Sequence, residues 1–473
     1  MASGLREGRP TLKERPSLGE MFALIGEPLP EEAAGRPFPA HVATDSRCVE
    51  PGGAFVALEG ERVDGHRYVP QALERGAGLI VVRRGKRPDG LPVPCVELEE
   101  PERDLARLAS AYLSSLEVPE VVAVTGSVGK TTTRAALQQV LGGRFRLHAA
   151  ARSLNTRIGC ACTVLAMPPD AEVLLLEFGA NKPGEILELT NLFPPTSAAI
   201  TQVAPVHLEG FGSLEGVLRG KMEIVRSPRL RRLLYNFDCL PLRNAALSMG
   251  GKAETLSIGS DGADCRIEAP RFEMRGNRPE LTFRLRSRDG ATARFSAGVW
   301  GTHLALPLAF AAAFGELKGI GLAECAEALR GFQPLDGRGR ILSLDGGRRF
   351  LVDDAYNANP ESMRASLATF VKLQVEGKMA ILGEMREMGR ETLRYHRELE
   401  PLLNGLQSVV LVGDAWRSAV PERPGLAFVR DWGEALEIAK GTPWTGLLVK
   451  GSNSLGLQNV VRGLVAERGG AAS

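Results

Sequence analysis

A short glycine-containing loop carries the clearest chemistry in the sequence. It lies between an apolar run at residues 121–124 and a predicted helix at residues 130–141, and it consists of Gly126, Ser127, Val128, Gly129, Lys130, Thr131 and Thr132. Glycines let the backbone approach phosphate oxygens, and a helix N-terminus favours an anion. The lysine adds a positive charge, and a threonine hydroxyl can ligate Mg²⁺. Val124 stands where the standard phosphate loop has its first glycine, but the flanking elements still predict a nucleotide phosphate site.

Two further side chains follow predicted strands, where ligands gather in parallel sheets. Glu177 follows the apolar run at residues 173–176, and His207 comes shortly after the run at residues 198–203. Because binding sites lie at the carboxyl ends of parallel strands, both side chains should lie near the phosphate loop. Glu177 would supply the oxygen ligand that a Mg²⁺ site needs beyond one hydroxyl. The alternatives are a solvated strand end for Glu177 and a structural role for His207.

The rest of the chain indicates the scaffold that positions these residues. Apolar runs alternate with helical stretches, which predicts an α/β fold with largely parallel sheets. We expect three domains: a small N-terminal α/β domain at residues 17–115, a central domain with a doubly wound, P-loop-type parallel sheet at 116–335, and a Rossmann-like α/β domain at 336–473. The strand-like stretch at 253–300 is interpreted as an antiparallel appendage of the central domain, and the glycine-rich stretch at 336–340 as a hinge.

Composition limits the partners and the cellular compartment that we expect for the protein. The hydrophobic fraction of 44% and the charged fraction of 24% are ordinary for a globular protein, and the net charge of +2 gives no argument for a nucleic-acid partner. No apolar run approaches the roughly 20 residues that span a bilayer. Residues 1–10 lack the apolar core of a signal peptide. We therefore expect a cytoplasmic protein without stable membrane insertion, whose seven scattered cysteines are buried or inert thiols.

The chain resembles the Mur ligases, the ATP-dependent amide-forming enzymes of peptidoglycan assembly, from about residue 43 to residue 465. Besides the phosphate loop, the resemblance rests on Asp45-Ser46-Arg47, residues 51–58, Asp64-Gly65-His66, Glu177-Phe178-Gly179-Ala180, residues 183–186, residues 207–216, residues 353–360, Leu382-Gly383-Glu384-Met385, His396 and Val449-Lys450-Gly451-Ser452. It is closest to the branch that joins D-Ala-D-Ala to UDP-MurNAc-tripeptide. The resemblance implies small-molecule substrates, an acyl-phosphate intermediate and a monomeric enzyme.

The same resemblance implies roles for individual residues. The N-terminal domain would hold the UDP part of the acceptor, the central domain ATP, and the C-terminal domain the incoming amine. Two Mg²⁺ ions would be held by Thr131, Glu177, His207 and Lys221, of which Lys221, one lysine among many by its chemistry alone, matches the lysine that this family carbamylates. Catalysis would use Lys130, Glu177, His207 and Lys221. The nucleotide would also meet Asn236, Asp238, Arg338, Arg340 and Asp354. Substrate contacts would come from Ser46, Arg47, Asn155, Thr156, Tyr356, Asn357 and Asn359.

Several positions depart from the family pattern. Leu304 and Pro307 replace two asparagines, the second of which is associated with adenine recognition. Thr156 replaces an asparagine, Arg157 an acidic residue, and Asn453 an arginine. The phosphate and metal groups are intact, whereas base-side and substrate-side groups are changed. Two alternatives stay open beside the main interpretation: a divergent ligase for another carboxylate and amine, and a non-catalytic subunit that binds a nucleotide or UDP-sugar.

Overall fold

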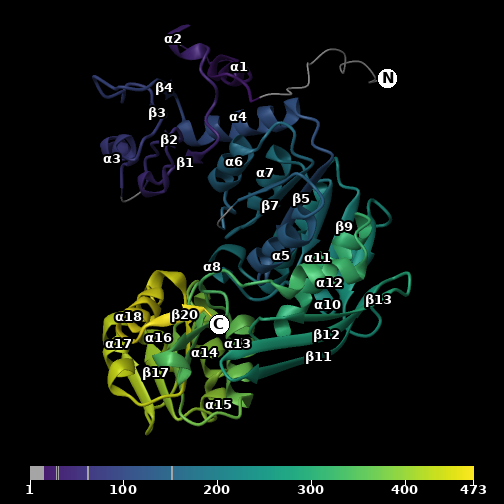
Figure 1. Cartoon of the computed structure of the whole chain (residues 1–473), viewed down its shortest axis with the longest axis vertical. Coiled ribbons are helices and arrows are strands. Elements are labelled where there is room, and N and C mark those ends of the chain that lie inside the picture. Colours follow the sequence, from purple (N-terminus) through teal and green to yellow (C-terminus); the bar gives the residue numbers. More distant parts are fainter. Residues whose placement is uncertain (1–14, 28, 30, 61–62, 151–152, 473) are drawn as a thin grey trace.

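The computed structural model describes residues 15–27, 29, 31–60, 63–150 and 153–472. The chain is arranged in three lobes, which we call N-terminal (around strands β1–β4), central (β5–β13) and C-terminal (β14–β20) (Figure 1). The expectation about residues 1–10 lies outside the described residues. Among the described residues, no helix combines the length and apolar character needed to cross a membrane.

The N-terminal lobe is built on a small parallel sheet. Within the described residues it has four strands in the order β1-β2-β3-β4, at Val42–Ala43, Ala54–Val56, Leu79–Arg83 and Cys95–Leu98. Its helices are α1 (Leu18–Ala23), α2 (Glu31–Ala34), α3 (Val69–Glu74) and α4 (Pro101–Ser115). Helix α4 packs against α6 of the central lobe, so the two lobes share one hydrophobic core.

The described part of the central lobe forms a nine-stranded sheet in the order β13-β12-β11-β10-β9-β8-β5-β7-β6. The strands are β5 (Glu120–Thr125), β6 (Leu147–Ala149), β7 (Val173–Glu177), β8 (Ser197–Ile200), β9 (Arg232–Asn236), β10 (Glu254–Gly259), β11 (Cys265–Arg275), β12 (Arg278–Arg286) and β13 (Thr292–Ala297). The helices are α5 (Lys130–Gly142), α6 (Arg157–Ala166), α7 (Glu185–Leu192), α8 (Leu208–Phe211), α9 (Leu214–Met222), α10 (Leu240–Leu247), α11 (Ala305–Leu317) and α12 (Leu322–Arg330).

Alternate residues of β5 show why the central sheet is covered on both faces. Val121 and Ala123 belong to a core shared with α6, α7 and α9, whereas Val122 and Val124 belong to a core shared with α5 and α11. A strand that is apolar on both faces must be buried on both, because successive side chains point to opposite sides. This arrangement confirms the doubly wound, parallel character predicted for the strands that carry the phosphate loop.

The stretch at residues 253–300 extends the central sheet. Strand β10 pairs in parallel with β9, and β12 pairs antiparallel with both β11 and β13. The β11–β12 hairpin reaches the C-terminal lobe (Figure 1). Its Phe272 packs edge-on, with ring centroids 5.2 Å apart, against Trp300, whose side chain belongs to the core of that lobe. At its tip, Asn277 Nδ2 donates to the carbonyl oxygen of Gly347 at 2.8 Å and to Ser343 Oγ at 3.2 Å. The hairpin therefore anchors one lobe to the other.

The C-terminal lobe contains a seven-stranded sheet within residues 340–472 of the described chain, in the order β18-β17-β16-β19-β15-β14-β20. Its strands are β14 (Arg340–Leu344), β15 (Arg349–Asp354), β16 (Lys378–Gly383), β17 (Ser408–Val412), β18 (Leu426–Val429), β19 (Gly446–Lys450) and β20 (Gly470–Ala472). Its helices are α13 (Pro360–Lys372), α14 (Thr392–Arg397), α15 (Glu400–Leu403), α16 (Asp414–Ala419), α17 (Trp432–Gly441) and α18 (Gln458–Arg468). Neighbouring strands among β15, β19, β16, β17 and β18 pair in parallel. Strand β14 pairs antiparallel with both β15 and β20. The predicted three-part α/β fold class is confirmed, and the boundaries at 115 and 335 stay predictions.

Candidate active site between the central and C-terminal lobes

The phosphate loop joins β5 to α5 through two glycines in left-handed or otherwise unusual conformations. Gly126 has φ +144°, and a Cβ atom there would lie 2.2 Å from Thr201 Oγ1. Gly129 has φ +86° and immediately precedes α5. Lys130 Nζ turns back and donates to the carbonyl oxygen of Gly126 at 2.7 Å. The loop thus presents a helix N-terminus and a lysine at the carboxyl end of a buried strand, an arrangement that suits an anion.

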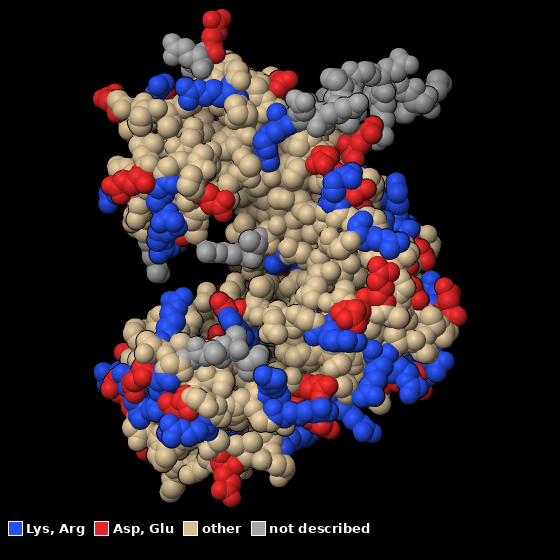
Figure 2. Space-filling view, viewed as in Figure 1, with Lys and Arg blue, Asp and Glu red and all other residues tan. Residues whose placement is uncertain are grey.

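One cavity of about 450 Å³ extends from this loop to the C-terminal lobe. In the space-filling view, a deep notch separates the N-terminal from the C-terminal lobe, and the central lobe closes its far end (Figure 2). The predicted site residues that line the cavity are Ser127, Val128, Gly129, Lys130, Thr131, Thr132, Asn155, Thr156, Glu177, His207, Arg338, Asp354, Tyr356, Asn357 and Asn359. The fold therefore gathers, around one space, residues that are up to about 230 positions apart in the sequence.

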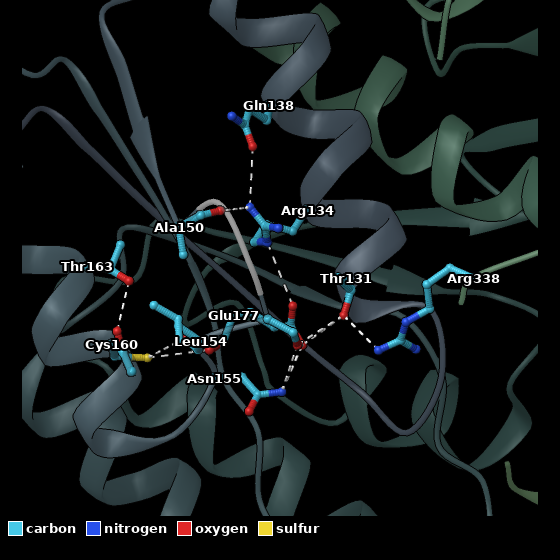
Figure 3. A network of polar contacts seen from close by, with 12 residues as sticks. Thr131, Arg134, Gln138, Ala150, Leu154, Asn155, Cys160, Thr163, Glu177 and Arg338 are labelled. Atoms are coloured by element: carbon cyan, nitrogen blue, oxygen red, sulfur yellow. Dashed lines mark hydrogen bonds and ion pairs between the residues drawn. The ribbon is translucent and has the colours of Figure 1, made fainter. Parts of the chain in front are cut away.

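Glu177 is the centre of a buried polar network (Figure 3). Its Oε1 accepts hydrogen bonds from Thr131 Oγ1 at 3.1 Å, Ser153 Oγ at 3.0 Å and Asn155 Nδ2 at 2.9 Å. Its Oε2 is buried without a hydrogen bond to the described part of the chain and lies 3.7 Å from Arg134 Nε. A buried anionic oxygen that lacks hydrogen bonds is rare in folded proteins. This oxygen is of the type that a divalent cation prefers.

His207 lies at the boundary between the central and C-terminal lobes. It precedes α8 with φ +48°, and its Nδ1 contacts Oε2 of Glu387 from the C-terminal lobe. Burial lowers the pKa of His207, Glu387 opposes this effect, and the cations Lys130 and Lys221 lower the pKa further. Oε2 of Glu387 thus counteracts part of the burial effect on the imidazole.

Lys221 is the most unusual lysine near the cavity. It lies on α9 with 1% of its surface exposed, donates from Nζ to the carbonyl oxygen of Ala180 at 3.4 Å, and places Nζ 5.4 Å from the centroid of the Phe211 ring. Burial, and then repulsion by Lys130, lower the pKa of Lys221 to about 7. Much of this side chain is therefore a neutral amine near neutral pH.

The C-terminal lobe supplies the opposite wall of the cavity. Arg338 Nη2 donates to Thr131 Oγ1 at 3.3 Å, and its guanidinium lies 3.9 Å from the centroid of the Tyr356 ring. Asp354 pairs with Lys450 Nζ at 2.9 Å, and the same Nζ donates to the carbonyl oxygen of Asn357 at 3.0 Å. Arg338 thus contacts the phosphate loop, and Lys450, paired with Asp354, lines the same cavity.

Two of the predicted substrate residues also have local structural roles. Asn359 precedes α13, and its Oδ1 accepts from the backbone N–H of Ser362 at 2.9 Å. Thr156 precedes α6, and its Oγ1 accepts from the backbone N–H of Gly159 at 3.3 Å. Both side chains stabilise the first turn of a helix whose N-terminus borders the cavity.

Seven predicted residues do not line the cavity: Gly126 and Lys221, described above, and five others. Asn236 donates to Gln202 Oε1, and the Asp238 carboxylate accepts from the backbone N–H of Ser260 at 3.0 Å. Arg340 pairs with Asp336 on the surface. In the N-terminal lobe, Ser46 Oγ donates to Gln71 Oε1 at 2.6 Å, and Arg47 pairs with Asp45 at 2.7 Å. Nucleotide or substrate contacts for these five residues stay predictions.

The positions that depart from the family pattern divide into two groups. Thr156, Leu304, Pro307 and Asn453 line the cavity. Pro307 Cγ would lie 3.8 Å from a Cβ atom on Gly129, so the wall that Leu304 and Pro307 form is apolar close to the phosphate loop. Arg157 instead forms two ion pairs, each at 2.7 Å, with Glu102 and Glu188. The arginine at this position is therefore paired with two carboxylates outside the cavity.

Sequence reasoning missed several polar residues around the site. Lys450, named above only within a family motif, ends β19, so the strand-end argument that indicates Glu177 would have indicated a site role for it as well. Gln202 lines the cavity and follows β8 in the same way. Arg134 lies four residues after Lys130 on α5, which places both on one helix face. Glu387 carries no comparable signal, because it lies in a loop.

Comparison with known proteins shows where this architecture belongs. The Mur ligase family, catalytic domain, matches residues 40–125; the Mur ligase middle domain matches residues 124–314; and the Mur ligase, glutamate ligase domain, matches residues 337–453. The UDP-N-acetylmuramoyl-tripeptide–D-alanyl-D-alanine ligase of Bacillus subtilis is 33% identical over 360 residues, which cover 76% of this chain and 76% of that protein. The chain belongs to the Mur ligase family.

Other Mur ligases are similar over a larger part of the chain. The enzyme of the same name from Mycobacterium bovis is 30% identical over 487 residues, which cover 93% of this chain and 94% of that protein. The crystal structure of the MurF ligase from Thermotoga maritima in complex with ADP superposes with a TM-score of 0.75 and 26% identity, over 90% of this chain and 97% of that one. All three lobes of the present Mur ligase thus have counterparts in a solved relative.

Proposed function

We propose that this Mur ligase uses ATP to join D-alanyl-D-alanine to UDP-N-acetylmuramoyl-tripeptide during synthesis of the peptidoglycan precursor. The observation that carries the proposal is one cavity lined both by the phosphate loop of the central lobe and by Arg338 and Lys450 of the C-terminal side, with Arg338 in contact with Thr131. A site of this kind can hold the triphosphate of ATP and bring the carboxylate and amine substrates to its γ-phosphate. The choice of substrates is supported by the names of the similar ligases and by the large share of each chain over which they match.

The reaction follows from the weakness of a carboxylate as an acyl donor. A carboxylate oxygen of the tripeptide attacks the γ-phosphorus of ATP, which breaks the bond to the β-phosphate oxygen and yields an acyl phosphate and ADP. The dipeptide amine then attacks the acyl carbon, loses a proton, and expels inorganic phosphate. Lys130 and Arg338 lie where they can neutralise charge on the transferring group, which is the main catalytic demand of phosphoryl transfer. Docking of the C-terminal lobe would keep water from the acyl phosphate.

The residues around Glu177 fit a divalent cation. The carboxylate is buried, one of its oxygens lacks a hydrogen bond within the described chain, and a threonine hydroxyl of the phosphate loop lies 3.1 Å from the other oxygen. Thr131, Glu177, His207 and a carbamylated Lys221 would hold two Mg²⁺ ions. When bound, Mg²⁺ would offset the negative charge of the phosphoryl oxygens.

Lys221 has the properties that carbamylation requires. Its lowered pKa leaves a neutral amine whose lone pair can attack CO₂, forming an N–C bond and releasing one proton. The product is an anion, which would replace the repulsion between Lys221 and Lys130 by attraction. This change removes the cost of a second buried cation and supplies a carboxylate-like ligand. The electrostatics around Lys221 therefore support the modification that the family resemblance implies.

The remaining assignments concern the substrates. Ser46 and Arg47 of the N-terminal lobe would meet the UDP part of the acceptor. Tyr356 and Asn357, both on the cavity wall, would meet the amine substrate. The nucleotide base would lie near the apolar wall of Leu304 and Pro307. We further propose that the enzyme acts as a monomer in the cytoplasm.

A second candidate is a ligase for a different amine or carboxylate. Leu304, Pro307 and Asn453 on the cavity wall favour it, because each replaces a polar group of the family pattern. Phosphate release should be measured with ATP, UDP-MurNAc-tripeptide and D-Ala-D-Ala, together and with each one omitted. Release that needs all three supports the main proposal, and release with other amines alone supports the second. No release with any acceptor would indicate a non-catalytic binding protein.

A further inference from the structure

The C-terminal lobe places a carboxylate directly against the candidate metal ligand His207. Glu387 lies in the loop after β16, and its Oε2 contacts Nδ1 of His207, 180 positions away in the sequence. The two residues have φ values of +64° and +48°, and they are two of four non-glycine residues with positive φ in the part of the chain that the structure describes. Such backbone is costly for a residue with a side chain and persists where the surroundings hold it in place.

The neighbouring residues show that this contact belongs to a packed boundary. Leu208 packs against both the core of the central lobe and the core of the C-terminal lobe. Gly389 has φ +56°, and a Cβ atom there would lie 3.6 Å from Cγ of Glu209. Residues 207–209 therefore face residues 387–389, and Figure 1 shows α8 at the boundary between the two lobes.

The chemistry of the contact assigns the two ring nitrogens of His207. An ionised carboxylate can only accept a hydrogen bond, so Nδ1 carries the hydrogen and the lone pair is on Nε2. His207 lines the cavity, whereas Glu387 is not among the described residues that line it. Histidines that bind metals commonly donate their other N–H to a carboxylate, which fixes the tautomer and ring orientation and raises ligand basicity.

We propose that Glu387 is a positioning residue for His207, holding the Nδ1–H so that Nε2 is presented to a divalent cation in the cavity. The inference rests on the proposed metal site and adds a residue that acts through His207. Because Glu387 comes from the C-terminal lobe, the metal site is complete when that lobe is docked. Metal binding and lobe docking would then favour each other.

The test is the affinity of the full-length protein for Mn²⁺, measured by electron paramagnetic resonance of the free ion. Glu387→Ala should weaken binding by about 10–100-fold, the usual effect of losing such a partner. Glu387→Gln keeps a carbonyl oxygen that can accept from Nδ1, so its loss should be clearly smaller. The thermal unfolding midpoint of each variant should stay close to that of the unaltered protein, since Glu387 is half exposed.

Two control variants separate positioning from docking. Asn277→Ala removes a hydrogen-bonded contact between the same lobes at the tip of the β11–β12 hairpin, and Glu391→Ala removes a surface ion pair with Arg394 close to Glu387. Both should lose far less Mn²⁺ affinity than Glu387→Ala, because each leaves the contact between His207 and Glu387 in place. An equal loss in Asn277→Ala, or unchanged affinity in Glu387→Ala, would overturn the positioning role. Failure of the unaltered protein to bind Mn²⁺ would instead overturn the metal site, and this inference with it.

Discussion

Replacing Lys221 with methionine should abolish activity and yet stabilise the folded protein. Burial and the charge of Lys130 lower the pKa of Lys221 from 10.5 to about 7. The unfolded chain keeps the higher pKa, so between these values it binds more protons than the folded chain does. The stability of the unaltered protein therefore rises with pH over this range. Lys221→Met fills a similar volume without a charge and removes this dependence.

The size of the effect follows from the two pKa values. A tenfold change in a protonation constant is worth about 1.4 kcal/mol. At pH 7 the penalty for burying Lys221 is then on the order of 4 kcal/mol, and at pH 9 about 2 kcal/mol, because the unfolded chain is closer to neutrality there. The stability advantage of Lys221→Met should therefore shrink by about 2 kcal/mol between pH 7 and pH 9.

The assay is urea unfolding followed by circular dichroism at both pH values, in buffers freed of CO₂. Lys182→Met, which changes an exposed lysine, is the control and should show no such pH-dependent gain. Adding bicarbonate should stabilise the unaltered protein and leave Lys221→Met unchanged, because only a neutral amine at residue 221 can form the carbamate. If Lys221→Met is no more stable than the unaltered protein at pH 7, or if its advantage is the same at pH 9, the reasoning about this lysine is wrong.

Two further substitutions test the cavity itself. Gly126→Ala should lower kcat/KM for ATP at least 100-fold, because the new Cβ would meet Thr201 Oγ1 at 2.2 Å and the residue has φ +144°. Gly184→Ala, with φ +91° but open space around it, should lose stability and keep kcat/KM within a few-fold. Equal kinetic losses in the two variants would contradict this prediction. Arg338→Ala should lower kcat/KM for ATP by about 10–100-fold, the range for a hydrogen bond to a charged group. Arg340→Ala should change kcat/KM little, because Arg340 pairs with Asp336 at the surface. Steady-state kinetics that reverse this order would show that the two arginines are misassigned.

The parts of the site that could be predicted from the sequence are those with a local signal. The phosphate loop carries its glycines, lysine and threonine within seven residues, and a strand and a helix flank it. Glu177 was found because it ends an apolar run, and the parallel pairing of β5 with β7 and β8 brings such ends together. The three-part α/β fold followed from the same alternation of runs and helices.

The parts that could not be predicted depend on contacts between distant segments. The sequence could not separate Arg338 from Arg340, because only the packing of the C-terminal lobe shows that one faces Thr131 and the other Asp336. The sequence of residues 253–300 predicts antiparallel strands, as β11–β13 are, but polar strands carry no mark of the partner with which they pair, and the parallel pairing of β10 with β9 is not evident from the sequence. Glu387 reaches His207 only through the docking of two lobes, which no local pattern encodes.

Transfer of oxygen from the acceptor carboxylate to the released phosphate distinguishes activation as an acyl phosphate from other routes to the amide. UDP-MurNAc-tripeptide labelled with ¹⁸O in its terminal carboxylate should be incubated with the enzyme, ATP and D-Ala-D-Ala, and the released phosphate analysed by mass spectrometry. An acyl phosphate passes one carboxylate oxygen to the phosphate, so each amide formed should yield one ¹⁸O-labelled phosphate. Amide formation with unlabelled phosphate would contradict the proposed mechanism.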